Sequence, residues 1–228
     1  MKKLSIFVAL FLLVGLGACS KKSSTGVGQF QVVNASAGFG PVDVYMDGSK
    51  FISNLGYEDA SGYLPLAEGS HVMNFPSAGT TTSLFDVNLT TAANINQTMI
   101  VYGRTSSLQV FAVQDNISSP GSNKAAIRFF QLCPDAPLLD FGTLVSGTYT
   151  RLYTARSFEN ATTASSNSGF STIDPGTYTF QAKVNGAGTT LLTAGGFTFE
   201  AGKIYTLYLS GTSGSPTDPL VLSMVVHN

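Results

Sequence analysis

Charge is scarce in this chain of 228 residues, of which only 11% are Asp, Glu, Lys or Arg. Tryptophan is absent, and cysteine and histidine occur only twice each. The formal net charge is −1, and no basic stripe follows Lys21 and Lys22. Nucleic acid is therefore not an expected partner, because its binding needs clustered positive charge.

The shortage of cysteine and histidine also limits the chemistry. Cys133 ends an apolar run directly before Pro134, and we interpret it as a small, half-buried residue at a strand end. A catalytic thiolate needs a nearby imidazole, and His71 and His227 fall in different predicted domains. The sequence has no Gly-x-Ser-x-Gly elbow, zinc-protease motif, phosphate loop or dinucleotide fingerprint. It therefore predicts no catalytic residue, no cofactor and no metal, and we expect the protein not to be an enzyme.

What is present begins with a secretory pattern. Lys2 and Lys3 precede an apolar run over residues 6–14, too short to cross a bilayer as a mature helix. Leu16-Gly17-Ala18-Cys19 resembles the bacterial lipobox. This resemblance implies cleavage between Ala18 and Cys19 and acylation of Cys19, for example by palmitate. The alternative is an ordinary signal peptide whose removal leaves a free thiol.

The rest of the chain reads as β-structure. Apolar residues seldom recur at helical spacing, whereas short runs of β-branched and aromatic residues alternate with Gly, Pro, Asn and Asp. Tight-turn signals such as Asp47-Gly48 separate some of them. The strands expected are 29–34, 42–46, 50–52, 69–75, 82–89, 97–103, 108–113, 125–132, 138–141, 150–154, 169–173, 176–184, 189–192, 195–200, 203–210 and 220–226.

A polar segment with a Pro-Gly pair divides these strands into two groups, each long enough for a domain. Small polar residues after Cys19 indicate a flexible tether. The predicted division is a lipoprotein signal peptide 1–18, a lipidated tether 19–28, a first domain 29–115, a linker 116–123 and a second domain 124–228.

The two halves share a weak internal repeat. Each opens with an apolar strand, a Pro-containing turn and a second strand bearing one Asp, over 30–45 in the first half and 127–141 in the second. Further on, 64–72 matches 173–179, and 96–103 matches 201–208.

These segments resemble the DUF4397 family of uncharacterised extracytoplasmic β-domains, in which bacterial envelope lipoproteins are common. The resemblance implies two tandem divergent copies and gives fold and location only. Asn34 and Gln131 stand where the family tends to have His, which argues against a titrating or metal-binding imidazole there. With alternating patterns such as Val42 and Val44 against Asp43 and Tyr45, we expect two immunoglobulin-like antiparallel β-sandwich domains in an all-β chain.

Repeated acidic residues are the first candidates for a site. Asp43 and Asp140 recur at matching positions, with Asp47 near the former, and the pattern half resembles a calcium loop. We favour carboxylates that bond local backbone amides and fix turns. Whether the Asp43 region binds calcium stays open. A cleft that gathered Asp43, Glu68 and His71 would favour chemistry instead.

Loop aromatics are the second candidates, since aromatic rings stack on sugars. The acidic group Glu58, Asp59 and Glu68 reads as a solvated loop face. The alternative for the aromatic residues, which we favour, is that their rings lie inside the sandwiches, which need aromatic residues in their cores. The loop aromatics in question are Phe39, Tyr57, Tyr63, Tyr149, Tyr153 and Phe158.

The sequence thus predicts a bacterial cell-envelope protein held in a membrane, with the outer membrane favoured, through a lipid on Cys19. Its expected role is that of a non-catalytic binding or structural module, with an envelope protein or a glycan as partner. The alternatives are a carbohydrate-binding or adhesion module and, less favoured, an envelope hydrolase.

Overall fold

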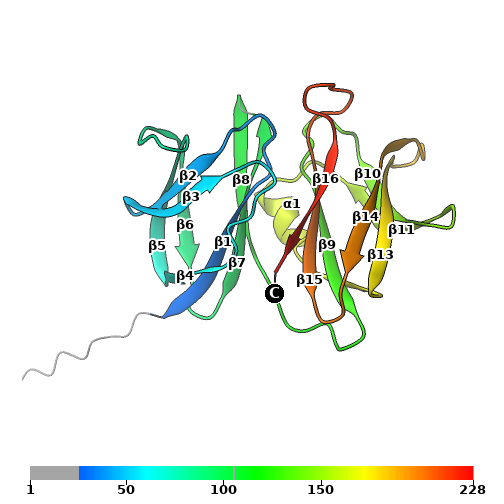
Figure 1. Cartoon of the computed structure of the whole chain (residues 1–228), viewed down its shortest axis with the longest axis horizontal. Coiled ribbons are helices and arrows are strands. Elements are labelled where there is room, and N and C mark those ends of the chain that lie inside the picture. Colours follow the sequence, from blue (N-terminus) through cyan, green and yellow to red (C-terminus); the bar gives the residue numbers. More distant parts are fainter. Residues whose placement is uncertain (1–25, 105, 228) are drawn as a thin grey trace, which may run out of the picture.

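The computed structural model describes residues 26–104 and 106–227, which form two β-sandwiches lying side by side (Figure 1). Ala18 and Cys19 lie outside the described residues. Within these ranges, no helix has the length and apolar character needed to cross a membrane.

The first sandwich has two four-stranded sheets, with orders β4-β1-β7-β8 and β3-β2-β5-β6. β1 begins at Val27 and so includes the last two residues of the predicted tether. The strands are β1 (Val27–Asn34), β2 (Val42–Met46), β3 (Ser49–Leu55), β4 (Leu64–Ala67), β5 (Gly69–Pro76), β6 (Ser83–Thr91), β7 (Asn96–Arg104) and β8 (Ser107–Gln114).

The second sandwich has sheets with orders β12-β9-β15-β16 and β11-β10-β13-β14. A short helix, α1 (Ala161–Ser166), lies between β11 and β12. The strands are β9 (Ala125–Gln131), β10 (Leu139–Val145), β11 (Thr148–Arg156), β12 (Ser171–Ile173), β13 (Gly176–Val184), β14 (Thr190–Phe199), β15 (Ile204–Ser210) and β16 (Val221–Val226).

Strand order is the same in both sandwiches, with β1 to β8 corresponding to β9 to β16. Gly103, near the end of β7, and Gly211, directly after the matching β15, both have a φ of 90°. The predicted all-β sandwich fold is confirmed. It is not antiparallel throughout, because β1 pairs with β7 and β9 with β15 in parallel.

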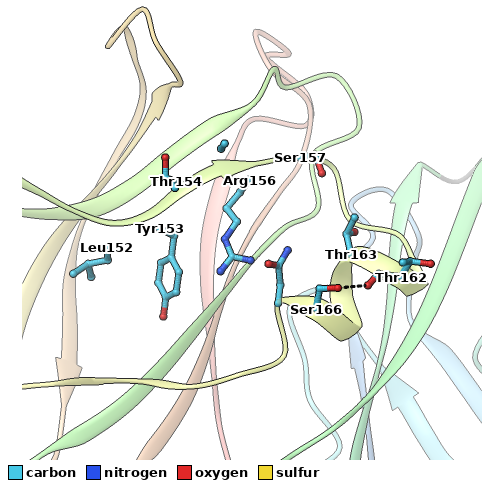
Figure 2. Close-up of a pocket in the computed structure, with 10 residues that line it drawn as sticks. Leu152, Tyr153, Thr154, Arg156, Ser157, Thr162, Thr163 and Ser166 are labelled. Carbon is cyan, nitrogen blue, oxygen red and sulfur yellow. Dashed lines mark hydrogen bonds between the residues drawn. The ribbon is translucent and has the colours of Figure 1, made fainter.

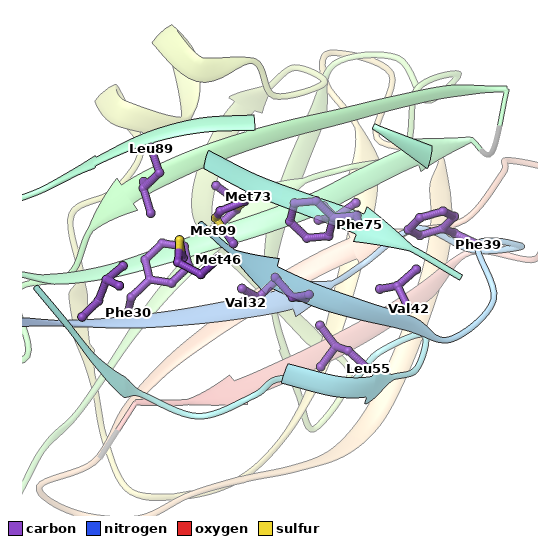
Figure 3. Close-up of a cluster of buried hydrophobic side chains, with 13 residues drawn as sticks. Phe30, Val32, Phe39, Val42, Met46, Leu55, Met73, Phe75, Leu89 and Met99 are labelled. Atoms are coloured by element: carbon purple, nitrogen blue, oxygen red, sulfur yellow. The ribbon is translucent and has the colours of Figure 1, made fainter. Parts of the chain in front are cut away.

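Each sandwich has its own apolar core. In the first, Phe30 and Val32 of β1 and Met99 of β7 point between the two sheets, where they meet Met73 and Phe75 of β5 (Figure 3). These side chains have at most 1% exposed surface. In the second, Phe129, Phe141 and Phe180 occupy the corresponding space, with the first two rings stacked 3.9 Å apart.

The sheets β4-β1-β7-β8 and β12-β9-β15-β16 face each other, so the protein has four β-layers (Figure 1). We call their contact the inter-sandwich interface. Residues that alternate with the core residues fill it, and β9 and β15 are consequently buried on both faces. The apolar residues of the interface are Val33, Ala35, Ile100, Tyr102, Phe111, Val113, Phe130, Leu132, Ala164, Tyr208 and Val225, with Phe158 partly buried beside them.

Apart from shifts in strand ends, three elements differ from the sequence prediction. β4 is an edge strand of four residues that contains Pro65. The sequence does not predict it, because it is short and because proline is uncommon inside strands. The predicted strands 189–192 and 195–200 are one strand, β14, which continues through Gly195 and Gly196. α1 has no apolar period, but Asn160 and Thr163 form a capping box that the sequence displays.

Candidate functional site

A buried ion pair joins the sandwiches at the inter-sandwich interface. Arg128 Nη2 of β9 donates to Asp115 Oδ1, just after β8, over 2.6 Å, and neither side chain has exposed surface. Asp115 Oδ2 accepts from Tyr63 and Thr98. Arg128 Nε donates to Thr206 Oγ1 over 2.7 Å. The pair is therefore bonded at both ends, as a buried ion pair requires.

His227, directly after β16, completes this network. Its Nδ1 lies 2.9 Å from Gln31 Nε2 and its Nε2 lies 2.6 Å from Thr206 Oγ1. Nδ1 also lies 2.9 Å from the Tyr63 hydroxyl, so both ring nitrogens have partners inside the interface. Burial and the nearby Arg128 lower the pKa of His227 to about 4. His227 is thus a neutral structural residue at pH 7.

The polar contacts of the interface occur twice, in swapped form. Matching backbone bonds, from Asp115 N to Asn96 O and from His227 N to Ile204 O, identify Asp115 and His227 as equivalent positions. The strand registers likewise equate Gln31 with Arg128. The contact of Arg128 with Asp115 therefore has a counterpart in the contact of Gln31 with His227. Such reciprocity is the signature of a two-fold, isologous contact.

Asp43 and Asp140 have equivalent structural roles. Asp43 accepts from Lys50 Nζ over 2.6 Å and from the backbone N–H of Asn54 over 2.9 Å. Asp140 accepts from Arg151 over 3.1 Å and from the N–H of Ala155 over 3.0 Å. The hydrogen bonds from Lys50, Asn54 and Gly79 lower the pKa of Asp43 to about 2. Each carboxylate fixes the end of a β-hairpin.

The two other proposed members of a catalytic cleft also have local partners. His71 Nδ1 lies 2.6 Å from Asp47 Oδ2, and its Nε2 lies 2.9 Å from Ala67 O. Glu68 accepts from the backbone N–H of Gly26. Burial opposes charge on His71, but its bonds to Asp47 and Ala67 raise its pKa overall. Among the described residues, no group of three His, Cys, Asp or Glu side chains is placed to hold a metal.

Cys133 is buried, and burial raises the pKa of its thiol to about 11. Its Sγ donates to Asp135 Oδ1 over 3.0 Å. The side chains of Asn34 and Gln131 accept from the backbone N–H groups of Ser36 and Cys133 respectively. These two residues therefore hold their own chain segments in shape.

None of the six loop aromatics is exposed, in agreement with the favoured alternative. Phe39 and Tyr153 are core residues with 3% and 7% exposed surface. Tyr57 and Phe158 contact the opposite sandwich, through Ser210 and Tyr102 respectively. Sandwiches of this size fill their cores and contacts with aromatic rings, which sequence position alone does not reveal.

A pocket of about 470 Å³ lies between β11 and α1, and we call it the Arg156 pocket (Figure 2). Hydroxyl side chains from both elements line it: Thr154, Ser157, Thr162, Thr163 and Ser166. Arg156 extends from β11 into the space between Tyr153 and Ser166 (Figure 2). Its Cζ lies 4.9 Å from the centroid of the Tyr153 ring.

The Arg156 guanidinium is incompletely paired. Its Nη1 has no exposed surface and no hydrogen-bond partner among the described residues. Burial lowers the pKa of Arg156, while Glu159 raises it through space. Glu159 is fully buried and accepts from Asn167 Nδ2 over 2.9 Å and 3.2 Å. The sequence does not predict this pocket, because an arginine at a strand end carries no motif.

Comparison with known proteins gives a family and little else. No curated protein matches this chain. Structural similarity was found to a product complex of the multi-modular glycogen-degrading pneumococcal virulence factor SpuA, with a TM-score of 0.25 and 9% identity over 89% of this chain. The chain spans only 22% of that protein's length.

A second solved structure, described as alpha-glucan binding by a streptococcal virulence factor, has a TM-score of 0.24 and 8% identity. The alignment covers 86% of this chain and 96% of that one. Similarity at this level carries no argument about function.

The sequence model of a domain of unknown function, DUF4397, matches residues 28–142. The match covers the first sandwich and the opening of the second, up to Gly142 in β10. Membership of the second half as a separate copy stays a prediction, although its sheets repeat the strand order. Because the match spans half of the chain, the protein belongs to the DUF4397 family.

Proposed function

We propose that this protein is a lipid-anchored envelope protein whose two sandwiches act as one fixed, non-catalytic binding body. The observation that carries the proposal is that the following titratable side chains are engaged in structural hydrogen bonds. Asp115, Arg128 and His227 are bonded within the inter-sandwich interface. Asp43 and Asp140 fix hairpins. Groups committed to structural bonds are poor acids, bases or ligands for catalysis.

The Arg156 pocket supports binding. Its lining offers hydroxyls and a guanidinium, which hydrogen-bond a ligand but do not exchange protons readily near neutral pH. A small number of placed polar groups in a concave surface is typical of a ligand site.

The anchor rests on Cys19. Acyl chains contribute about 0.8 kcal/mol per buried methylene, so three chains would make attachment effectively permanent. The absence of an acidic residue after Cys19, where Ser20 stands, favours the outer membrane. A polar tether would then hold the sandwiches away from the lipid surface.

Two measurements test the proposal. Fractionation of cells that express the full chain should place it with the membranes, and Cys19→Ser should release it at equal yield. A variant that remains membrane-bound would disprove the lipid anchor. Purified protein incubated with envelope glycans should retain a glycan without converting it, as followed by mass spectrometry. Steady accumulation of a cleaved product would refute the non-catalytic role.

A further inference from the structure

We propose that the Arg156 pocket binds a sugar that carries a carboxylate, with Arg156 as the group that pairs with that carboxylate. This inference rests on the proposed binding function and names the ligand class for it. Four features of the pocket lead to it: the unpaired guanidinium, the bonded state of the neighbouring acid, the hydroxyl lining and the departure from the first sandwich.

The unpaired guanidinium favours an anionic ligand. A buried N–H without a partner is unfavourable, and Arg156 Nη1 is such a group. The planar guanidinium fork matches the two oxygens of a carboxylate. The Tyr153 ring, 4.9 Å from the Arg156 Cζ, limits the directions in which the fork can turn. Since Nη1 itself has no accessible surface, a carboxylate in the pocket would pair with the part of the Arg156 guanidinium that lines it.

The neighbouring acid does not supply that acceptor. Glu159 directs its carboxylate oxygens to Asn167 Nδ2. Burial raises the pKa of Glu159. Arg156 therefore keeps positive charge that a ligand can neutralise.

The lining favours a sugar over a peptide carboxylate. Peptide carboxylates are commonly captured by free backbone N–H groups. Here the N–H groups of Thr162 and Thr163 are already bonded to Asn160 Oδ1. The hydroxyls of Thr154, Thr163 and Ser166 already donate to neighbouring groups. What the pocket offers a ligand are the hydroxyls of the exposed Thr162 in α1 and the half-exposed Ser157 after β11. Hydroxyls both donate and accept, as the hydroxyl groups of a sugar ring do.

The first sandwich shows that the scaffold does not need this pocket. The pairing of Val42 with Leu55 corresponds to that of Leu139 with Arg156. Leu55 is a core residue with 4% exposed surface. The segment after it, 56–63, has no helix, whereas the corresponding 157–170 contains α1. Arginine and helix are thus additions to a repeated framework that is stable with leucine at this position.

Isothermal titration calorimetry of the full chain in detergent, with trigalacturonate as probe, tests the proposal. Binding should be lost or weakened at least about tenfold when the probe carboxylates are methyl-esterified, because the charged acceptor disappears. Arg156→Leu should weaken binding of the free acid to the same extent. The matched control Lys183→Gln removes a positive charge from β13 of the same sheet, outside the pocket, and should leave binding unchanged.

The outcomes separate the possibilities. If Arg156→Leu misfolds, by loss of its thermal transition, Thr162→Val serves instead, and it should weaken binding by removing a hydroxyl from the rim. No binding of trigalacturonate at millimolar concentration, equal binding of the methyl ester, or full binding by Arg156→Leu would each overturn the inference. Binding of a peptide acid but not its amide, without sugar binding, would also overturn it. None of these results bears on the lipid anchor or on binding of other glycans, which the proposed function predicts separately.

Discussion

Arg128 and Asp115 lie 2.6 Å apart across the inter-sandwich interface, and neither side chain has exposed surface. Because desolvation makes a buried ion pair costly, this pair contributes more to the relative orientation of the two sandwiches than to net stability. The Arg128 guanidinium also lies 5.1 Å from the Phe130 ring and 4.5 Å from the Phe170 ring. A guanidinium with these partners fixes one relative placement of the sandwiches.

Arg128→Met should destabilise the protein by about 3–5 kcal/mol, because it leaves the Asp115 carboxylate buried without its cation. Urea denaturation followed by circular dichroism gives the free energy of unfolding. The double variant Arg128→Met/Asp115→Leu should recover at least about 1 kcal/mol relative to the single variant. A single variant within about 0.5 kcal/mol of the parent would show that the ion pair is not buried in solution.

Stability should fall as the pH is lowered from about 6.5 to about 4 because of His227. The unfolded histidine binds a proton below about pH 6.5, whereas the folded one resists protonation down to a pKa of about 4. The unfolded state therefore gains protons in this window and stability decreases, by about 3 kcal/mol in full. His227→Gln should flatten the dependence of the unfolding free energy on pH.

His71 serves as a control, because its effect on the pH dependence of stability has the opposite sign. Its folded pKa is raised, so its contribution is fully present below about pH 6.5 and is lost as the pH rises through the folded pKa. His71→Gln should therefore remove a stabilising contribution at low pH. If the two variants changed the pH dependence in the same direction, the assignment of a neutral, buried His227 would be wrong.

Calcium at millimolar concentration should leave the melting temperature unchanged, because N–H donors occupy the Asp43 carboxylate. Asp43→Asn and Asp140→Asn should both lower the melting temperature, since each loses charge-assisted bonds to a hairpin. A thermal-shift assay measures both effects. A rise in melting temperature with calcium that Asp43→Asn abolishes would instead establish a cation site.

Arg156→Leu should not destabilise the protein, and its melting temperature should equal or exceed that of the parent. The substitution removes a buried donor without a partner and restores the residue type found at Leu55 in the first sandwich. Loss of function with a gain in stability is typical of binding sites. A clear drop in melting temperature would mean that Arg156 supports the fold.

How far the sequence predicts this protein depends on the element. Alternating runs such as Val42–Met46 and turn residues such as Asp47-Gly48 predict the strands and hairpins correctly. The β9 segment, apolar apart from Arg128 and Gln131, does not show that its second face contacts another sandwich, since a fully buried strand has the same pattern in either setting.

The candidate site is predicted less well than the fold. The fixing of turns by Asp43 and Asp140 follows from their position at a strand start. Arg156 and α1 meet only through tertiary packing, and a single arginine has no periodicity or motif to mark it. Near the pocket, the capping pattern at Asn160 is the sequence signal that we recognise, and it predicts the helix but not the pocket.

Differential scanning calorimetry of the full chain most directly tests the claim that the two sandwiches act as one body. We predict a single transition whose calorimetric and van't Hoff enthalpies agree, and which Arg128→Met moves to lower temperature without splitting. Two separate transitions in the parent protein, with Arg128→Met shifting only one of them, would contradict it.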